Sequence, residues 1–255
     1  MTKIISLANQ KGGVGKTTTA INLGASLAAC ERSVLLIDLD PQANATSGVG
    51  ISNVEKSMYD VLVEDTPLRD IVVPTELPTL FVAPSSVDLV GAEVELRDAI
   101  GREYYLKRAL ESVAGDYNYI LIDSPPSLGL LTINGLTAAH SVLVPLQSEY
   151  FALEGVSQLM NTVERVRGAV NPGLDIEGIV LTMYDERMNL ARQVADEVRA
   201  HFGEKVYQTI IPRNVRLGEA PSFGKPIILY DIRSRGSEAY VSLAKEFIRR
   251  AENVI

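Results

Sequence analysis

The fold is decided by residues 9–18, which read Asn9-Gln10-Lys11-Gly12-Gly13-Val14-Gly15-Lys16-Thr17-Thr18. An apolar run typical of a strand precedes this stretch, and an Ala-rich run typical of a helix follows it. In a strand, glycine-rich loop and helix of this kind, backbone N–H groups and the helix dipole converge on phosphate oxygens. The stretch therefore predicts a phosphate-binding P-loop.

The loop also predicts the ligands. Lys16 is expected to reach the β- and γ-phosphates of ATP, and the Thr17 hydroxyl to bind Mg²⁺. The general pattern G-x-x-x-x-G-K-[ST] places glycine at position 10, but this chain has Gln10, followed by an additional lysine, Lys11. The predicted nucleotide-binding residues of the loop are Lys11, Gly12, Gly13, Val14, Gly15, Lys16, Thr17 and Thr18.

Aspartates end two of the expected strands. Asp38 and Asp40 follow one apolar run, and Asp123 closes another. The carboxyl ends of strands line the ligand crevice of open α/β sheets, where an aspartate holds Mg²⁺ directly or through water. We expect Asp123 to act through water. Asp38 is either a further metal ligand or a structural hydrogen-bond partner of its loop, because an aspartate after a strand also caps loops and helices.

Strand-like and helix-like segments alternate along the chain, which predicts one α/β domain over residues 1–255. Several strands are apolar throughout, as in a doubly wound, mostly parallel sheet with helices on both faces. The expected strands are Lys3–Ala8, Ser33–Asp38, Thr79–Ala83, Tyr119–Asp123, Ser141–Pro145, Glu177–Thr182 and Val206–Ile211. The expected helices are Lys16–Ala29, Ala92–Val113, Leu128–Ala138, Leu153–Val170, Leu190–Phe202 and Ser237–Glu252. Residues 47–78 are expected to form a surface excursion with a short helical piece near residues 58–63, and residues 217–230 are expected to form a second irregular loop.

Composition narrows the class of protein. The 255 residues are 46% hydrophobic and carry a net charge of −8, so any nucleic-acid binding requires a local basic cluster. The single cysteine, Cys30, excludes a disulfide or iron–sulfur cluster held within one chain. We find no signal peptide or membrane-spanning run, and expect a cytoplasmic protein.

The motifs together resemble the deviant Walker-A ATPases and, among them, the ParA/Soj partition family. The resemblance runs nearly from end to end, and the length fits the short chromosomal type without an N-terminal helix-turn-helix domain. It is carried by the P-loop and by three further stretches: Asp38-Leu39-Asp40-Pro41-Gln42-Ala43-Asn44-Ala45-Thr46, Ile122-Asp123-Ser124-Pro125-Pro126 and Ile211-Pro212-Arg213-Asn214-Val215-Arg216-Leu217-Gly218-Glu219-Ala220-Pro221.

The resemblance implies an ATP hydrolase that dimerises around its nucleotide. Lys11 would be the signature lysine that reaches the nucleotide of the partner subunit, much as an arginine finger does. Gly12 would lie at the dimer contact, where a larger side chain blocks close approach. Asp40 would position the attacking water, so the expected catalytic residues are Lys11, Lys16 and Asp40.

The resemblance also implies a switch and a base-binding region. Asp123 and residues 124–126 would sense the γ-phosphate. Pro212 and Asn214 would lie near the adenine.

Finally, the resemblance implies that the ATP dimer binds double-stranded DNA without sequence preference and is nucleoid-associated. Arg187 and Arg216 are the first candidates for DNA contacts, with Arg192 and Arg213 beside them. Arginine–phosphate contacts give affinity that depends on salt rather than on base sequence. A centromere-binding, ParB-like protein would stimulate hydrolysis and release the dimer.

The sequence also bears on three alternative functions. A MinD-like membrane-cycling ATPase needs a basic amphipathic C-terminal helix, whereas the apolar side of residues 237–252 reads as a face that packs on its own domain. Among metabolic relatives, the cysteine count argues against iron–sulfur scaffolds and nitrogenase-type reductases. A cobyrinic acid amidoligase needs an amidotransferase domain for which the chain has no room. A ParA-like protein that positions a cargo other than DNA stays open.

Overall fold

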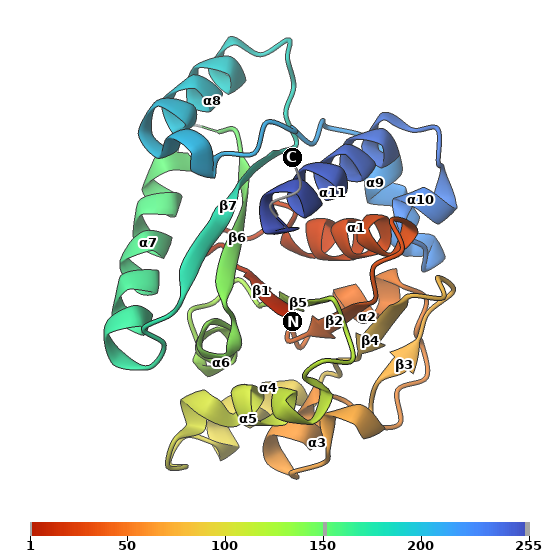
Figure 1. The fold of residues 1–255 in the computed structure, drawn as a ribbon, viewed down its shortest axis with the longest axis vertical. Helices are drawn as coiled ribbons and strands as arrows, with labels where there is room; N and C mark the ends of the chain where they lie inside the picture. The colour runs from red at the N-terminus through yellow and green to blue at the C-terminus, as the bar shows by residue number, and fades with distance from the viewer. Residues whose placement is uncertain (1, 150–151, 253–255) are drawn as a thin grey trace.

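The computed structural model describes residues 2–149 and 152–252, and its centre is a seven-stranded sheet (Figure 1). The strand order is β3-β4-β2-β5-β1-β6-β7, and all neighbours pair in parallel except the edge strand β3, which is antiparallel to β4. The strands are β1 Lys3–Leu7, β2 Val34–Asp38, β3 Val73–Pro74, β4 Leu80–Ala83, β5 Tyr119–Asp123, β6 Ser141–Gln147 and β7 Asp175–Thr182.

The α-helices cover both faces of the sheet, as the sequence predicts (Figure 1). Helices α1 and α11 pack on one face, and α3 to α8 lie on the other. The helices are α1 Lys16–Ala29, α2 Asn44–Gly48, α3 Met58–Val63, α4 Leu89–Glu95, α5 Tyr105–Leu110, α6 Leu130–Ala138, α7 Ala152–Ala169, α8 Asn189–Phe202, α9 Val215–Glu219, α10 Ile227–Tyr230 and α11 Arg235–Glu252.

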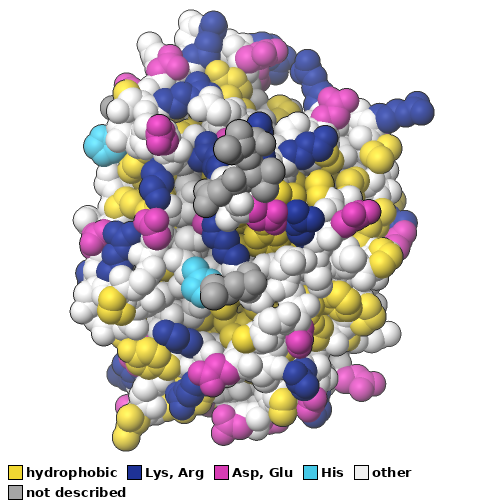
Figure 2. Space-filling view, in the orientation of Figure 1, with side chains coloured by type: hydrophobic (Ala, Val, Ile, Leu, Met, Phe, Trp, Pro, Cys, Tyr) yellow, Lys and Arg dark blue, Asp and Glu magenta, His cyan; other side chains and the backbone are white. Residues whose placement is uncertain are grey.

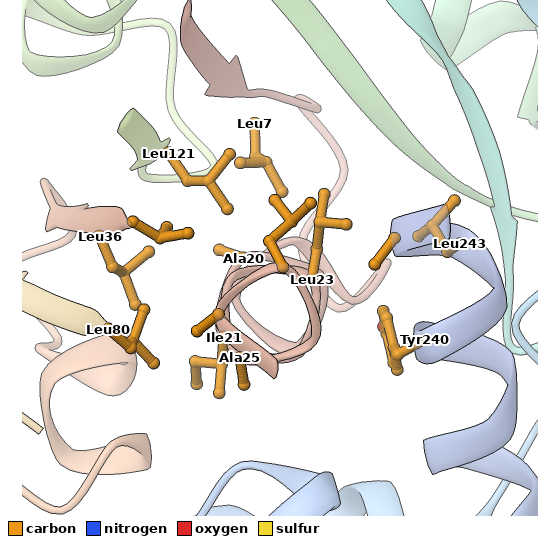
Figure 3. Close-up of a cluster of buried hydrophobic side chains, with 14 of the residues drawn as sticks. Leu7, Ala20, Ile21, Leu23, Ala25, Leu36, Leu80, Leu121, Tyr240 and Leu243 are labelled. Atoms are coloured by element: carbon orange, nitrogen blue, oxygen red, sulfur yellow. The ribbon is translucent and has the colours of Figure 1, made fainter. Parts of the chain in front are cut away.

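Helix α1 lies at the centre of one core layer (Figure 3). Leu7, Leu36 and Leu121 of the sheet point toward it, and Tyr240 and Leu243 of α11 close its other side; all five are at most 1% exposed. Because α1 is buried on most sides, the loop that precedes it is held firmly against the ends of the strands.

The prediction of a single helix at Ala92–Val113 was wrong. The chain forms α4, then a turn, then α5 with short 3₁₀ turns on either side. Gly101 adopts φ 66°, a left-handed conformation, and Ile100 before it is 96% exposed. A continuous helix would need regular helical dihedrals at Gly101, so the chain turns there and α5 packs separately on the sheet.

The strand expected at Val206–Ile211 was also wrong. This segment forms only one isolated bridge, Ile179 with Val206, and a second bridge joins Tyr184 to Pro212 just after it. The amides of Gln208 and Thr209 donate instead to the carboxylate of Glu246 on α11, each at 2.8 Å. A side chain distant in the sequence thus takes the donors that a continuous strand ladder requires.

Segments 47–78 and 217–230 contain short elements, and α3 confirms the helical piece expected near residues 58–63. Residues 47–78 include α3, which begins with a capping box formed by Ser57 and Asp60, and the two-residue strand β3. Residues 217–230 contain the end of α9 and all of α10. Across the residues that the structure describes, no helix has both the length and the apolar character required to cross a bilayer.

Candidate nucleotide-binding site

The loop between β1 and α1 has the backbone of a phosphate cradle. Gly13 and Gly15 adopt φ 75° and 85°, a region that side chains disfavour, and Gly15 is the N-cap residue of α1. A Cβ built on Gly12 or Gly13 would meet no atom within 4 Å. The loop therefore faces open space, with the N-terminus of a 14-residue helix behind it.

Two polar side chains that the sequence analysis missed anchor this loop. Asn9 donates to the carbonyl of Pro145 at 2.8 Å and accepts from the amide of Lys11 at 3.0 Å. The Thr182 hydroxyl donates to the carbonyl of Val14 at 2.8 Å. Pro145 and Thr182 belong to β6 and β7, so the ends of both strands fix the loop. Thr182 is the last residue of an expected strand, like Asp38 and Asp123, so its position at the carboxyl end of the sheet could have indicated a role at the site.

A cleft of about 560 Å³ opens above the loop and brings most of the predicted site together. Asp40 and Pro126 come from the loops after β2 and β5. The lining residues are Gly12, Gly13, Gly15, Lys16, Thr17, Thr18, Asp40, Pro41, Gln42, Asn44, Val90, Pro126 and Met183. The cleft thus collects the carboxyl ends of the central strands, where open α/β sheets bind ligands.

Two buried charged side chains lie at this cleft: Lys16 lines it, and Asp123 is close enough to Lys16 to interact with its charge. Lys16 is 7% exposed, and its burial lowers the pKa of the ammonium, against the opposing effects of Asp123 and Asp40. Asp123 is fully buried; burial and the nearby Asp38 raise its pKa well above the usual value. Both carboxylate oxygens of Asp123 lack a hydrogen-bond partner within the described chain.

An orphaned buried carboxylate fits a cation. Asp123, together with the Thr17 hydroxyl that lines the same cleft, supplies the hard oxygen donors that Mg²⁺ prefers. The register of β2 against β5 sets Asp38 directly beside Asp123. These residues therefore suit a magnesium ion that is held jointly by the chain and by phosphate oxygens.

Asp38 has a different set of partners. Its Oδ2 accepts from the amide and hydroxyl of Thr46 at 2.8 and 2.7 Å, and its Oδ1 accepts from the amide of Asp40 at 3.1 Å. Burial raises its pKa to about 6, although these hydrogen bonds oppose the rise. Asp38 thus holds the loop from β2 to α2 in place, which favours the structural alternative over direct metal binding.

Asp40 stays available for chemistry. It is partly exposed, lines the cleft, and its Oδ1 accepts only a local amide hydrogen bond, from Gln42 at 3.0 Å. Asp38 accepts a hydrogen bond from the backbone of Asp40 and so supports the loop, whereas the side chain of Asp40 remains accessible from the cleft.

A smaller cavity of about 230 Å³ adjoins the loop on the side of α9 and α11. Pro212 and Asn214 line it together with Gly15 and Thr18. The Oδ1 atom of Asn214 is buried without a partner in the described part of the chain. Met183, which no motif indicated, lines this cavity and the phosphate cleft and adopts φ 50°.

Lys11 lies at the rim of the site and not inside it. Its Nζ forms an ion pair of 2.6 Å with Oε2 of Glu149, and the two side chains are 41% and 50% exposed. Gln147 donates to the other oxygen of Glu149 at 2.6 Å. No sequence motif suggested Glu149 as a partner, because the contact joins residues far apart in the chain.

The arginines expected to contact DNA lie on the surface around α8 and α9. Arg187 is 85% exposed and forms two hydrogen bonds with Asp185, at 2.6 and 2.8 Å. Arg216 pairs with Glu219 at 2.8 Å and Asp231 at 3.6 Å.

The other two arginines are less constrained by carboxylates. Arg192 donates to Asn189 at 2.8 Å, and Arg213 lines a groove together with Arg187. Basic and acidic side chains are interspersed on the face shown in Figure 2. The groove that holds Arg187 and Arg213 is also lined by Asp185, Glu186, Glu219 and Glu238, so it is not a purely basic surface.

The apolar face of α11 is not free for a membrane. Tyr240, Leu243, Ala244 and Phe247 are at most 1% exposed and pack in the core that contains α1. This confirms the expected packing of the helix on its own domain.

Comparisons with known proteins place this site in a family context. A family model described as an AAA domain matches residues 2–176. The chromosome partitioning protein ParA of Caulobacter vibrioides is 58% identical over 252 residues, covering 97% of this chain and 94% of that protein. The sporulation initiation inhibitor protein Soj of Bacillus subtilis is 60% identical over 248 residues, covering 96% and 98%.

Solved structures share the fold, and one of them contains ADP and magnesium. A cobyrinic acid a,c-diamide synthase of Mycobacterium smegmatis with bound ADP and magnesium has a TM-score of 0.86 and 39% identity, covering 99% of this chain and 96% of that one. The cell division ATPase MinD of Pyrococcus furiosus has a TM-score of 0.83 and 27% identity, covering 98% and 99%. Because this chain and the synthase cover each other almost completely, chain length does not exclude a synthase of this kind, contrary to the expectation from sequence. The identity to the partition proteins, 58% and 60%, is higher than the 39% identity to the synthase.

Proposed function

Because the chain belongs to the ParA/Soj family of chromosome partition ATPases, we propose that it is an ATP-driven dimerising switch that moves DNA. The observation that carries this proposal is the phosphate cleft, which unites the P-loop, buried Lys16 and accessible Asp40, with Lys11 at its rim. ATP would bring two copies together, and hydrolysis would separate them. The whole of residues 1–255 is proposed to act as this one ATPase domain.

The residues of the cleft support an in-line attack of water on the γ-phosphate. Lys16 would neutralise charge on the β- and γ-phosphates, and Asp40, which lines the same cleft, would orient the water. Bound Mg²⁺ would neutralise further phosphate charge, held by Thr17 and Asp123. Lys11 of a partner subunit would stabilise charge that develops in the transition state, which makes hydrolysis depend on dimerisation.

DNA binding is proposed for the ATP dimer. Arg187, Arg192, Arg213 and Arg216 supply side chains that reach phosphate oxygens without reading base edges. The carboxylates that pair with Arg187 and Arg216 weaken any contact made by one copy. Two copies on one DNA duplex bind with a higher effective affinity, so ATP controls DNA binding through dimerisation.

A ParB-like centromere-binding protein is proposed to stimulate hydrolysis and release the dimer from DNA. The direct test of the switch is sedimentation of the Asp40→Ala variant with Mg-ATP, with and without duplex DNA, at low and moderate salt. We expect an ATP-dependent dimer that joins DNA and leaves it as the salt concentration rises. A dimer that ignores DNA and joins anionic liposomes would contradict the proposal, as would a persistent monomer.

A further inference from the structure

Helix α4 and the turn before it carry an exposed apolar stripe. Val87, Val90 and Val94 are 72%, 58% and 74% exposed, and their spacing places them on one side of the helical segment. The opposite side, with Leu89 and Ala92, is fully buried against the sheet. The three valines therefore contribute nothing to the core of the chain, and apolar groups gathered in this way mark contact surfaces.

Carboxylates surround this stripe. Asp88, Glu93 and Glu95 belong to the same segment, and Glu64 follows the neighbouring helix α3. Tyr59 of α3 donates to both oxygens of Glu95, at 3.1 and 3.2 Å, which fixes the two helices side by side. Within the described residues, none of these four carboxylates lies within 4.0 Å of a lysine or arginine nitrogen in an ion pair.

The stripe is joined to the nucleotide site. Val90 lines the phosphate cleft, and Pro126 of the expected switch lines the same cleft. The amide of Ser85, just before α4, donates to the hydroxyl of Thr46 at 2.9 Å, and that hydroxyl donates to Asp38 at 2.7 Å. A molecule bound on this stripe would therefore contact a residue that also lines the phosphate cleft.

We propose that the α4 surface, made of Val87, Val90 and Val94 with the carboxylates of Glu64, Asp88, Glu93 and Glu95, docks a basic, partly apolar segment of a partner protein. Carboxylates that form no ion pair among the described residues, placed around an apolar stripe, complement a segment in which lysines or arginines surround leucine-like side chains. They oppose DNA, and they oppose symmetric contact with a second copy, which would set like charges against each other. Stimulation of hydrolysis from this surface rests on the proposed function, but the docking itself does not.

Two variants test the α4 surface without touching the proposed catalytic residues. Val87→Ser combined with Val94→Ser removes the apolar groups, and Asp88→Lys inverts one charge; Asp88 makes no capping hydrogen bond to α4. The matched control is Ile232→Ser, because Ile232 is 65% exposed and lies before α11. All of these side chains are largely exposed, so we expect unchanged thermal unfolding.

The probe is a synthetic helical peptide with a leucine stripe flanked by lysines, compared with a counterpart in which glutamate replaces every lysine. Fluorescence anisotropy of the full chain at low salt measures binding. We expect the lysine peptide alone to bind. The double valine variant should bind it at least about tenfold more weakly. Asp88→Lys should weaken it a few-fold with a smaller salt dependence, and Ile232→Ser should bind like the wild type.

Equal binding of the lysine peptide to wild type and both variants, or none to the wild type, would overturn the proposal. The proposal would also be overturned if the double valine variant lost ATP-dependent dimerisation but still bound the peptide. That result would assign the surface to a second copy of the chain. If the peptide binds the α4 surface as expected but the wild type never dimerises with ATP, the docking stands and the proposed switch fails.

Discussion

The ammonium of Lys11 is bound by a carboxylate of its own chain, with Nζ 2.6 Å from Oε2 of Glu149. The same lysine is proposed to reach the nucleotide of a partner subunit, and it cannot do both at once. The contact with Glu149 therefore competes with dimerisation. Both side chains are 41–50% exposed, so water and salt screen the pair and its contribution is about 0.2–1 kcal/mol.

We expect Glu149→Gln to strengthen the ATP dimer. A dimer releases two such pairs, so its dissociation constant should fall about 2- to 30-fold at low salt, and less at high salt. Equilibrium sedimentation with Mg-ATP in the Asp40→Ala background measures this constant. Glu154→Gln, on an exposed position of α7, is the control. A weaker dimer in Glu149→Gln would show that Glu149 assists assembly and does not restrain it.

We expect Lys16→Ala to lose ATP affinity. The substitution removes a buried cation that lines the phosphate cleft, and losing one partner of a buried lysine–phosphate charge pair costs about 2–5 kcal/mol. The dissociation constant for Mg-ATP should therefore rise at least about 30-fold in calorimetry. Lys225→Ala, an exposed lysine outside the cleft, should bind like the wild type. Full affinity in Lys16→Ala would refute the assignment of the P-loop.

We expect substitution of Asp38 to lower stability and substitution of Asp40 to abolish hydrolysis. Asp38→Ala leaves the buried groups of Thr46 without their acceptor, so we expect unfolding free energy to fall by at least about 2 kcal/mol in urea titrations. Asp40→Ala should keep the stability of the wild type within about 0.5 kcal/mol, bind ATP, and lose hydrolysis in a phosphate-release assay. The reverse pattern, with Asp38→Ala stable and Asp40→Ala active, would contradict both roles.

The sequence predicted the P-loop and the positions of Asp38 and Asp123 because these signals are local. A glycine loop between strand and helix, or an aspartate at the end of an apolar run, needs no knowledge of the rest of the chain. The irregular segment at 206–211 depends instead on Glu246, and the environment of Lys11 depends on Glu149. Side chains that meet only after folding leave no periodic pattern, so propensity alone could not predict them.

We expect Arg187→Ala and Asp185→Asn to change DNA affinity in opposite directions. Asp185 holds Arg187 in two hydrogen bonds and has its pKa lowered to about 2 by this arginine, so it stays ionised and competes with DNA phosphate. Arg187→Ala should bind duplex DNA more weakly, with a salt slope smaller by about one per contact, whereas Asp185→Asn should bind more tightly. The control is Arg69→Ala, whose side chain is 61% exposed and belongs to the short 3₁₀ turn at residues 68–70. Equal affinities for all variants across a salt titration would exclude Arg187 as a contact.

Glu246 should make stability depend on pH in the acid range. Burial opposes ionisation of this side chain, which is 7% exposed, but the amides of Gln208 and Thr209 and the guanidinium of Arg250 outweigh that effect and lower its pKa. A carboxyl with a lowered folded-state pKa stabilises the fold above its unfolded pKa of about 4.3, and this stability is lost as pH falls through the folded value.

At pH 7 we expect Glu246→Gln to lower the free energy of unfolding by about 1–3 kcal/mol, because the two amides lose a charged acceptor. The difference from the wild type should shrink as pH falls below about 4.3, since protonation removes the same charge from the wild type. Urea unfolding at a series of pH values measures both effects, and Glu238→Gln on the exposed side of α11 is the control. A difference that stays constant from neutral pH to well below the unfolded pKa would show that the shape of the side chain, and not its charge, holds the segment at 206–211.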